Sequence, residues 1–276
     1  MTGDGAQESA YAECARIVQD GDADRAVSVG FAPEDRRDGL WALYAFAIET
    51  ARIRDHVSQP MPGEIRLQWW RDRLTSKEAE AEAAGQGSPV ATALVETVRR
   101  YDLPVDAFER YLDARIFDLY SDPMGDRQEF EAYAGETQSA IAMLAAMILD
   151  RSAAPVAAEA AGHAGVAACA ALVLRDAERH RARHQIFVPS DILGATGLDA
   201  SAWLAGGPAA EPAREAMVAF GRDHLARAEA QIDRLGASVR PALLPVLFAA
   251  RGIGQKSRSP TEPLRRLWFY WRTMRR

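Results

Sequence analysis

The sequence predicts an all-α fold, a single domain over residues 1–276 in which about nine or ten helices surround one core. Alanine, leucine and arginine dominate while runs of β-branched residues are scarce, a composition that favours helix over strand. Apolar residues recur with helical spacing between short breaks that contain glycine and proline. The 276 residues are 48% hydrophobic, which is enough to bury a large core, and they show no internal repeat or linker.

The first half of the chain predicts a series of helices separated by turns. Residues 33–35 are a proline followed by two acids, which is typical of a helix start because acids favour the positive end of the helix dipole. The proline-rich residues 58–63 predict a turn, and residues 76–88 are either a frayed helix end or a loop. The expected helices are residues 7–19, 33–56, 64–74, 89–101 and 104–120.

The second half continues the pattern. Its longest expected helix is rich in alanine. Residues 185–189, which follow this helix, predict an extended backbone segment. Ser190 and Asp191 then suit the cap of a further helix. Two glycines and a proline at residues 206–208 break the chain again. The expected helices are residues 127–150, 155–183, 211–235, 241–250 and 261–275.

Cysteine usage and the absence of targeting patterns predict a location. Cys14 and Cys169 lie far apart and neither belongs to a CxxC motif, which indicates a reducing compartment. Residues 1–9 are polar and acidic, unlike a signal or transit peptide. The longest apolar runs, residues 140–149 and 165–174, are shorter than the roughly 18 residues that a membrane span needs. We therefore expect a cytoplasmic protein that does not cross a bilayer, with contact to the inner face of the membrane left open.

Charge is distributed unevenly along the chain. The formal net charge is −6, but residues 251–276 hold eight basic residues and one acid, a local charge of +7. This basic segment interleaves arginines with aromatic residues, among them Trp268 and Trp271, a pattern that suits an anionic membrane surface or an acidic partner. Nucleic-acid binding would need such basicity over a face of the fold, and the remainder is acidic. We expect no nucleic-acid partner.

Two segments carry recognisable motifs. Residues 40–46 read LWALYAF and precede Asp55, while residues 165–176 read GVAACAALVLRD and lead into IFVP at residues 186–189. Together with Tyr133-Ala134-Gly135 between them, their order and spacing resemble the squalene/phytoene synthase family. Its motifs typically read LWALYAF before an Asp-rich DDxxD, then VAG, then GLALQLTNILRD and IYLP. The resemblance implies an isoprenoid-synthase-like helical bundle around a central cavity.

The resemblance also implies a chemistry, from which this chain departs in its first motif. In the family, aspartates at i and i+4 on two facing helices hold Mg²⁺, which in turn holds the diphosphate of a prenyl substrate. Two prenyl diphosphates are then joined head to head. In the alignment, Ala51 and Arg52 stand at the two leading aspartates of the first motif. Asp55 is the one acid that remains there.

The second motif departs in the same way. It keeps Arg175 and Asp176, but Arg179 and His180 stand where the family has further acids. His180 and His184 have a spacing that could hold a transition metal, yet the arginines beside them argue against a cation site. Positions that are polar or glycine in the family are here Cys169, Leu172 and Gln138.

Asp55 and Asp176 are therefore the residual candidates for catalysis or metal binding. We expect no cofactor, and Mg²⁺ only if the chain is a prenyltransferase. Arginines could instead bind a prenyl diphosphate or an anionic lipid without a metal, because a guanidinium group binds phosphate bidentately. A solvated basic helix face is the alternative interpretation. The candidate anion-binding residues are Tyr44, Arg52, Arg175, Arg179 and Arg183.

Residues 62–72, PGEIRLQWWRD, resemble a divergent branch of the family. That branch includes a mitochondrial complex I assembly factor with a phytoene-synthase-like domain and its bacterial relatives, in which the metal motifs are similarly altered. Trp69 and Trp70 suit either core packing or a partner surface. The resemblance implies a protein partner in the respiratory chain.

Three functions remain open at this point. The favoured one is a non-catalytic assembly or binding factor, with respiratory complex I as the partner that the resemblance implies. The second is an active head-to-head prenyltransferase of isoprenoid biosynthesis. The third is a metal-free protein that binds an anionic lipid or prenyl diphosphate. The missing carboxylates argue against the second.

Overall fold

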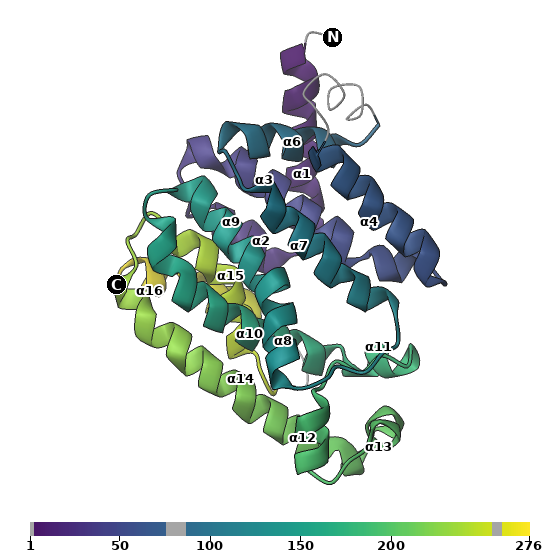
Figure 1. Cartoon of the computed structure of the whole chain (residues 1–276). Helices are drawn as coiled ribbons and strands as arrows, with labels where there is room; N and C mark the ends of the chain where they lie inside the picture. The colour runs from purple at the N-terminus through teal and green to yellow at the C-terminus, as the bar shows by residue number, and fades with distance from the viewer. Residues whose placement is uncertain (1–2, 76–86, 256–260) are drawn as a thin grey trace.

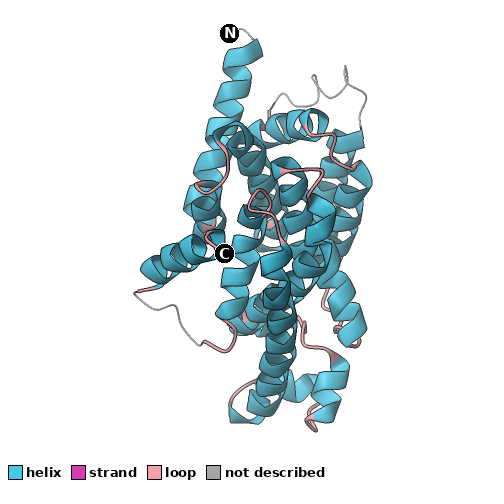
Figure 2. Cartoon of the chain, turned by 90° about the vertical axis from the view of Figure 1, so that its left-hand side faces the viewer, coloured by secondary structure: helices cyan, strands magenta, loops and turns pink. Residues whose placement is uncertain are grey.

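The computed structural model describes residues 3–75, 87–255 and 261–276, and every regular element in these ranges is a helix (Figures 1 and 2). The all-α prediction is therefore confirmed. The segment left open between helix end and loop, residues 76–88, lies outside the described residues except for its last two.

The first half of the described chain gives six α-helices and two short 3₁₀ turns. Most agree with the expected ranges to within a few residues. They are α1 (Gly3–Gly21), α2 (Ala23–Val29), α3 (Glu34–Ala51), a 3₁₀ turn (Ile53–His56), α4 (Pro60–Thr75), α6 (Pro89–Arg100), α7 (Val105–Ile116) and a 3₁₀ turn (Phe117–Leu119).

The second half is arranged around one long helix, α10, which has α14 and α15 against it (Figure 1). Its α-helices are α8 (Arg127–Ala134), α9 (Ala140–Leu149), α10 (Ala158–Arg175), α11 (Ala177–Ala182), α12 (Ser190–Ala195), α13 (Ala200–Ala205), α14 (Glu211–Gln231), α15 (Arg240–Arg251) and α16 (Glu262–Met274). A π-helical turn (Gly135–Ser139) joins α8 to α9, and 3₁₀ turns cover Ala154–Ala157, Pro208–Ala210 and Ile232–Arg234.

Three expectations are corrected. The helix expected from residue 64 begins at Pro60, because prolines in the first turn remove only N–H groups that have no partner inside the helix. The helix expected over residues 155–183 is interrupted at Asp176, where α10 ends and α11 begins. The described residues hold fifteen α-helices rather than nine or ten. Short helices such as α2 and α13 are not predicted, because they contain too few residues to show a helical apolar pattern.

The expected cap at Ser190 and Asp191 is also wrong. Pro189 precedes the first residue of α12, and no side chain caps this helix end. The Ser190 hydroxyl instead donates a hydrogen bond to the carbonyl oxygen of Gly125 at 2.5 Å. The Asp191 carboxylate accepts one from Arg127 Nε at 2.7 Å. Both side chains therefore tie α12 to the start of α8.

Helix α10 connects the two apolar clusters of the core. Its first half, including Ala164 and Ala167, packs in the cluster built on α1, α3, α6, α9 and α15. Its second half, including Cys169 and Leu174, packs in the cluster around α12, α13 and α14. The stretch Ala154–Arg175 is the one described segment long and apolar enough to span a membrane, and 67% of its apolar 18-residue window is buried inside the protein. Such burial is what the central helix of a bundle shows.

Candidate functional site

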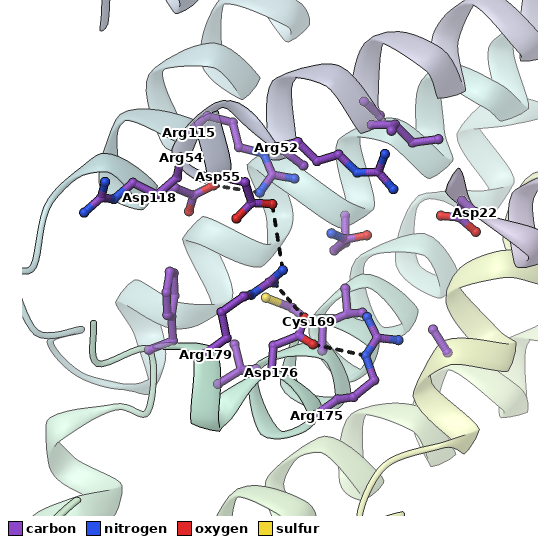
Figure 3. A pocket seen from close by; sticks show the side chains of 18 of the residues that line it. Asp22, Arg52, Arg54, Asp55, Arg115, Asp118, Cys169, Arg175, Asp176 and Arg179 are labelled. Atoms are coloured by element: carbon purple, nitrogen blue, oxygen red, sulfur yellow. Dashed lines mark hydrogen bonds and ion pairs between the residues drawn. The ribbon is translucent and has the colours of Figure 1, made fainter. Parts of the chain in front are cut away.

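The two motif segments meet at a cavity of about 380 Å³ (Figure 3). Helix α3 ends at Ala51, and the following 3₁₀ turn places Asp55 at the cavity wall. Opposite, α10 ends at Arg175 and Asp176, and α11 carries Arg179 to the same space. The ends of α3 and α10 thus bring together residues more than a hundred positions apart.

A chain of ion pairs joins the two residual aspartates. Arg183 Nη1 lies 2.7 Å from Asp55 Oδ1, and Arg179 Nη1 lies 3.8 Å from Asp55 Oδ2. The same Arg179 guanidinium lies 3.0 Å from Asp176 Oδ2 through Nη2, and Arg175 Nε lies 3.4 Å from Asp176 Oδ1. Arg179 therefore stands between the two carboxylates, at the position where a cation would have to sit to bind both (Figure 3).

The residues present do not fit the Mg²⁺ ions that the family resemblance implies. Mg²⁺ needs several oxygen ligands in near-octahedral array. Each residual carboxylate already faces a guanidinium group, and no group of three or more His, Cys, Asp or Glu side chains suited to a metal occurs in the described ranges. The side chains of Ala51 and Arg52 supply no ligand oxygen.

The histidines do not form a metal pair either. Helix α11 ends at Ala182, so His184 lies beyond it with a left-handed φ of 56°. The His180 ring packs against Phe187, with centroids 4.6 Å apart. Burial lowers the pKa of His180 below its ordinary value of 6.5. The negative charge of Asp176 raises this pKa and the positive charge of Arg179 lowers it, so the effect of burial remains. The imidazole is therefore neutral at pH 7.

Two of the arginines at the cavity have no carboxylate within ion-pair distance among the described residues. Arg52 Nη2 reaches the carbonyl oxygen of Gly21 at 3.3 Å. Arg54 Nη1 donates to the carbonyl oxygen of Val57 at 2.8 Å and so holds the turn after α3. In all, seven arginines and five aspartates line the cavity, an excess of positive charge. They are Arg25, Arg52, Arg54, Arg115, Arg175, Arg179 and Arg183, with Asp22, Asp24, Asp55, Asp118 and Asp176.

A buried polar cluster at the cavity was not anticipated from the sequence. Arg115 Nη1 lies 3.0 Å from Asp118 Oδ2, and these side chains are only 9% and 14% exposed. Tyr133 Oη donates to Asp118 Oδ1 at 2.6 Å and accepts from Arg115 at 3.3 Å. Burial, with Asp118 adding to it, raises the pKa of Tyr133 well above its ordinary value. The sequence offers one signal of this cluster: Arg115 and Asp118 stand at i and i+3 on an otherwise apolar face of the expected helix.

Three further positions that the resemblance marks lie at the cavity, and Tyr44 does not. Gln138, Cys169 and Leu172 all line the cavity. Tyr44, by contrast, is not a lining residue: it is buried in the core with the Arg25 guanidinium 5.5 Å above its ring. Burial raises the pKa of Tyr44 to about 12.

The four tryptophans proposed for partner or membrane contact divide into two kinds. Trp70 is buried against Phe46, with ring centroids 5.0 Å apart, and Trp69 packs edge-on against Trp70. Trp268 and Trp271 on α16 are 56% and 48% exposed. The first pair therefore belongs to the core and its margin, and the second to the surface.

Curated relatives match part of the chain. "NADH dehydrogenase (ubiquinone) complex I, assembly factor 6" is 32% identical over 160 residues in Bos taurus and 31% identical over 160 residues in Homo sapiens. Each match covers 58% of this chain and 47% of the relative, so the chain spans about half the length of these relatives. A phytoene synthase of Thermus thermophilus is 26% identical over 179 residues, covering 63% of this chain and 57% of that protein.

Solved structures match nearly the whole chain. A dehydrosqualene synthase superposes with a TM-score of 0.78 at 14% identity, covering 98% of both chains. The squalene synthase HpnC of Alicyclobacillus acidocaldarius superposes with a TM-score of 0.71 at 17% identity, covering 95% of both. At such identities these likenesses show the fold alone. The family model "Squalene/phytoene synthase" matches residues 18–272. The predicted resemblance is confirmed, and the chain belongs to the squalene/phytoene synthase family.

Proposed function

We propose that this protein is a non-catalytic member of the family that acts as an assembly or binding factor for respiratory complex I at the inner face of the membrane, without a cofactor. The observation that carries the proposal is the position of Arg179 between Asp55 and Asp176. A guanidinium group there neutralises the two carboxylates that a prenyltransferase would need for its metal ions.

The chemistry of the altered motifs supports this proposal. A Mg²⁺ ion at these aspartates would have to displace Arg179 and Arg183 and would still lack ligands from Ala51 and His180. The relatives named as complex I assembly factor 6 support the choice of partner. The resemblance of residues 62–72 to the same branch points in the same direction.

A turnover assay tests the non-catalytic part of the proposal. Purified protein incubated with farnesyl or geranylgeranyl diphosphate and Mg²⁺ is expected to release no pyrophosphate above the protein-free background. A dehydrosqualene synthase assayed in parallel serves as the active control. Robust release by this protein would contradict the proposal and favour the head-to-head prenyltransferase.

A deletion experiment tests the assembly part. Removing the gene from its host is expected to lower complex I content, measured by native electrophoresis and NADH oxidation in membranes. Re-expression of the wild type and of Asp55→Asn with Asp176→Asn should restore it equally, because partly exposed ion pairs contribute little to stability. Unchanged complex I content after deletion would contradict the proposed assembly role. Rescue by the wild type alone would point to a role for the carboxylates.

A second candidate function is metal-free anion binding in the cavity. The observation that favours it is Arg52, whose guanidinium faces the cavity lining with only a carbonyl oxygen as partner among the described residues. Arg175, held by one aspartate at 3.4 Å, lines the same space. An incoming phosphate could accept hydrogen bonds from both without displacing a carboxylate from Arg52.

Calorimetric titration with inorganic pyrophosphate and with geranylgeranyl diphosphate, without metal, measures this binding. Arg52→Gln is expected to raise Kd by roughly tenfold, because a charge-assisted hydrogen bond contributes about 1.5 kcal/mol or more. Arg16→Gln is the matched control, since Arg16 lies on the exposed face of α1 with Glu13 and Asp20. No measurable binding, or an equal effect of both substitutions, would exclude this function.

A further inference from the structure

Helix α16 is attached to the bundle by one face. Arg266, Phe269, Tyr270 and Thr273 on that face are buried. Arg266 pairs with Asp24 of α2 and, at 3.1 Å, with Glu262, and Tyr270 Oη donates to the carbonyl oxygen of Asp24 at 3.0 Å. The helix is therefore held in a defined orientation at the edge of the bundle, where Figure 2 shows it beside the chain end.

The opposite face of α16 is apolar and uncovered. Leu264 is 72% exposed and Leu267 49%, and they share this face with Trp268 and Trp271. These four make up half of the large hydrophobic side chains that are exposed in the described part of the protein. They recur at i, i+3, i+4 and i+7, which places them along one stripe of the helix. Such a concentration marks an interaction surface rather than scattered surface hydrophobics.

Arginines accompany this stripe. Arg272 lies over the ring of Trp268 at 5.2 Å and Arg275 over the ring of Trp271 at 4.1 Å. Neither of them, nor Arg265 or Arg276, has a carboxylate within ion-pair distance among the described residues, although most arginines at the cavity do. The partner of this surface must accept tryptophan and leucine side chains and supply negative charge beside them.

We propose that the outward face of α16, with Leu264, Leu267, Trp268 and Trp271 as its apolar stripe, binds the surface of an anionic phospholipid bilayer. A helix lying in the bilayer interface buries its apolar face among the acyl chains while its basic residues meet anionic headgroups. Tryptophan is favoured at that depth because its ring is apolar and its N–H is polar. The stripe of four large side chains flanked by arginines has this arrangement.

Helix α16 also borders a second cavity, which adjoins the arginine-lined cavity. This second cavity of about 160 Å³ lies between the arginine-lined cavity and α16, and the two cavities share four lining residues, Asp24, Leu172, Arg175 and Ala249. Arg265 of α16 lines the second cavity. Helix α16 therefore borders the second cavity through Arg265, while its apolar stripe faces away from the bundle.

Vesicle co-sedimentation of the full chain tests the proposal. The protein is expected to bind vesicles that contain phosphatidylglycerol, to bind phosphatidylcholine vesicles weakly, and to lose binding as salt rises. Arg272→Gln with Arg275→Gln, and separately Trp268→Ala with Trp271→Ala, should each weaken binding by roughly tenfold or more. The matched control is Met61→Ala with Ile65→Ala, since these residues are 71% and 63% exposed and belong to α4, a helix that lies away from α16 in Figure 1.

A second readout keeps the test independent of folding defects. Brominated lipids should quench the tryptophan fluorescence of the wild type, and Trp268→Phe with Trp271→Phe should abolish most of that quenching while preserving the apolar surface. Absence of binding to anionic vesicles would overturn the proposal and leave an acidic protein surface as the partner of α16. Binding that the α16 substitutions do not change, or that the α4 control weakens equally, would also overturn it. Complex I content plays no part in this test, so its failure is distinguishable from failure of the assembly role.

Discussion

Replacing Asp118 by alanine is expected to lower the free energy of unfolding by about 3–5 kcal/mol. The carboxylate is the charge partner of the buried Arg115 at 3.0 Å and accepts a hydrogen bond from Tyr133 at 2.6 Å. Removing it leaves a buried guanidinium charge with no other carboxylate within ion-pair distance in the described part of the chain. The loss is measured by urea unfolding followed by circular dichroism.

Two further variants show whether burial is the cause. Glu96→Ala breaks an ion pair of the same i, i+3 spacing with Arg99, but Arg99 is 62% exposed, so the expected loss is below about 1 kcal/mol. Asp118→Ala combined with Arg115→Met removes both charges and should recover part of the stability lost by Asp118→Ala alone. Equal losses for Asp118→Ala and Glu96→Ala would refute the explanation.

Gly165→Ala is expected to destabilise the fold by about 1–3 kcal/mol, although alanine is the better helix former. A Cβ atom at residue 165 would overlap the Ser139 hydroxyl and stand 2.7 Å from the Ser139 backbone nitrogen and 2.9 Å from its Cα. The obstacle is the backbone of the π-helical turn, which cannot rotate away as a flexible side chain would. Helix α10 or this turn must move, at a place where both border the core.

The matched control lies three residues earlier in the same helix. A Cβ atom at Gly162 meets nothing within 4 Å, so Gly162→Ala should stabilise the protein by roughly 0.5–1 kcal/mol through helix propensity. Opposite signs for the same substitution are therefore the expected result of chemical denaturation. A stabilised Gly165→Ala variant would show that α10 does not pack closely on this turn.

Both predictions concern the architecture that supports the cavity. Tyr133 belongs to the cluster with Arg115 and also to the motif Tyr133-Ala134-Gly135, whose last residue begins the π-helical turn. That turn places Gln138 in the cavity wall and Ser139 against Gly165. The two predictions therefore test two separate contacts of neighbouring segments, Tyr133 of α8 with Asp118 and Ser139 of the π-helical turn with Gly165 of α10.

Much of the candidate site could be predicted from the sequence. The alignment located Asp55 and Asp176 in segments that the fold brings to one cavity, because motif order and spacing are preserved in the chain. It also identified Arg179 and Arg183 as residues of that cavity. It could not reveal that they pair with these carboxylates, because a side chain at a helix end can point to solvent or across a cavity, and the neighbouring helix decides which.

Other errors have local physical reasons. Tyr44 carries a motif position but faces the core, because α3 is apolar almost all round and its helical period does not mark one side as the cavity side. The residues around Asp176 contain neither glycine nor proline, so the sequence does not predict the interruption there. Pro60 predicts a turn, although proline is also tolerated in the first turn of a helix.

By itself the sequence determined the all-α class and the family, since helical periodicity, composition and motif order are properties of the chain alone. Only the tertiary structure decided that Arg179 lies between Asp55 and Asp176, that Arg115 is buried with Asp118, and that Trp70 faces inward while Trp268 faces outward. These outcomes depend on which helices pack together, because a side chain's partners and exposure are set by residues that are distant in the sequence.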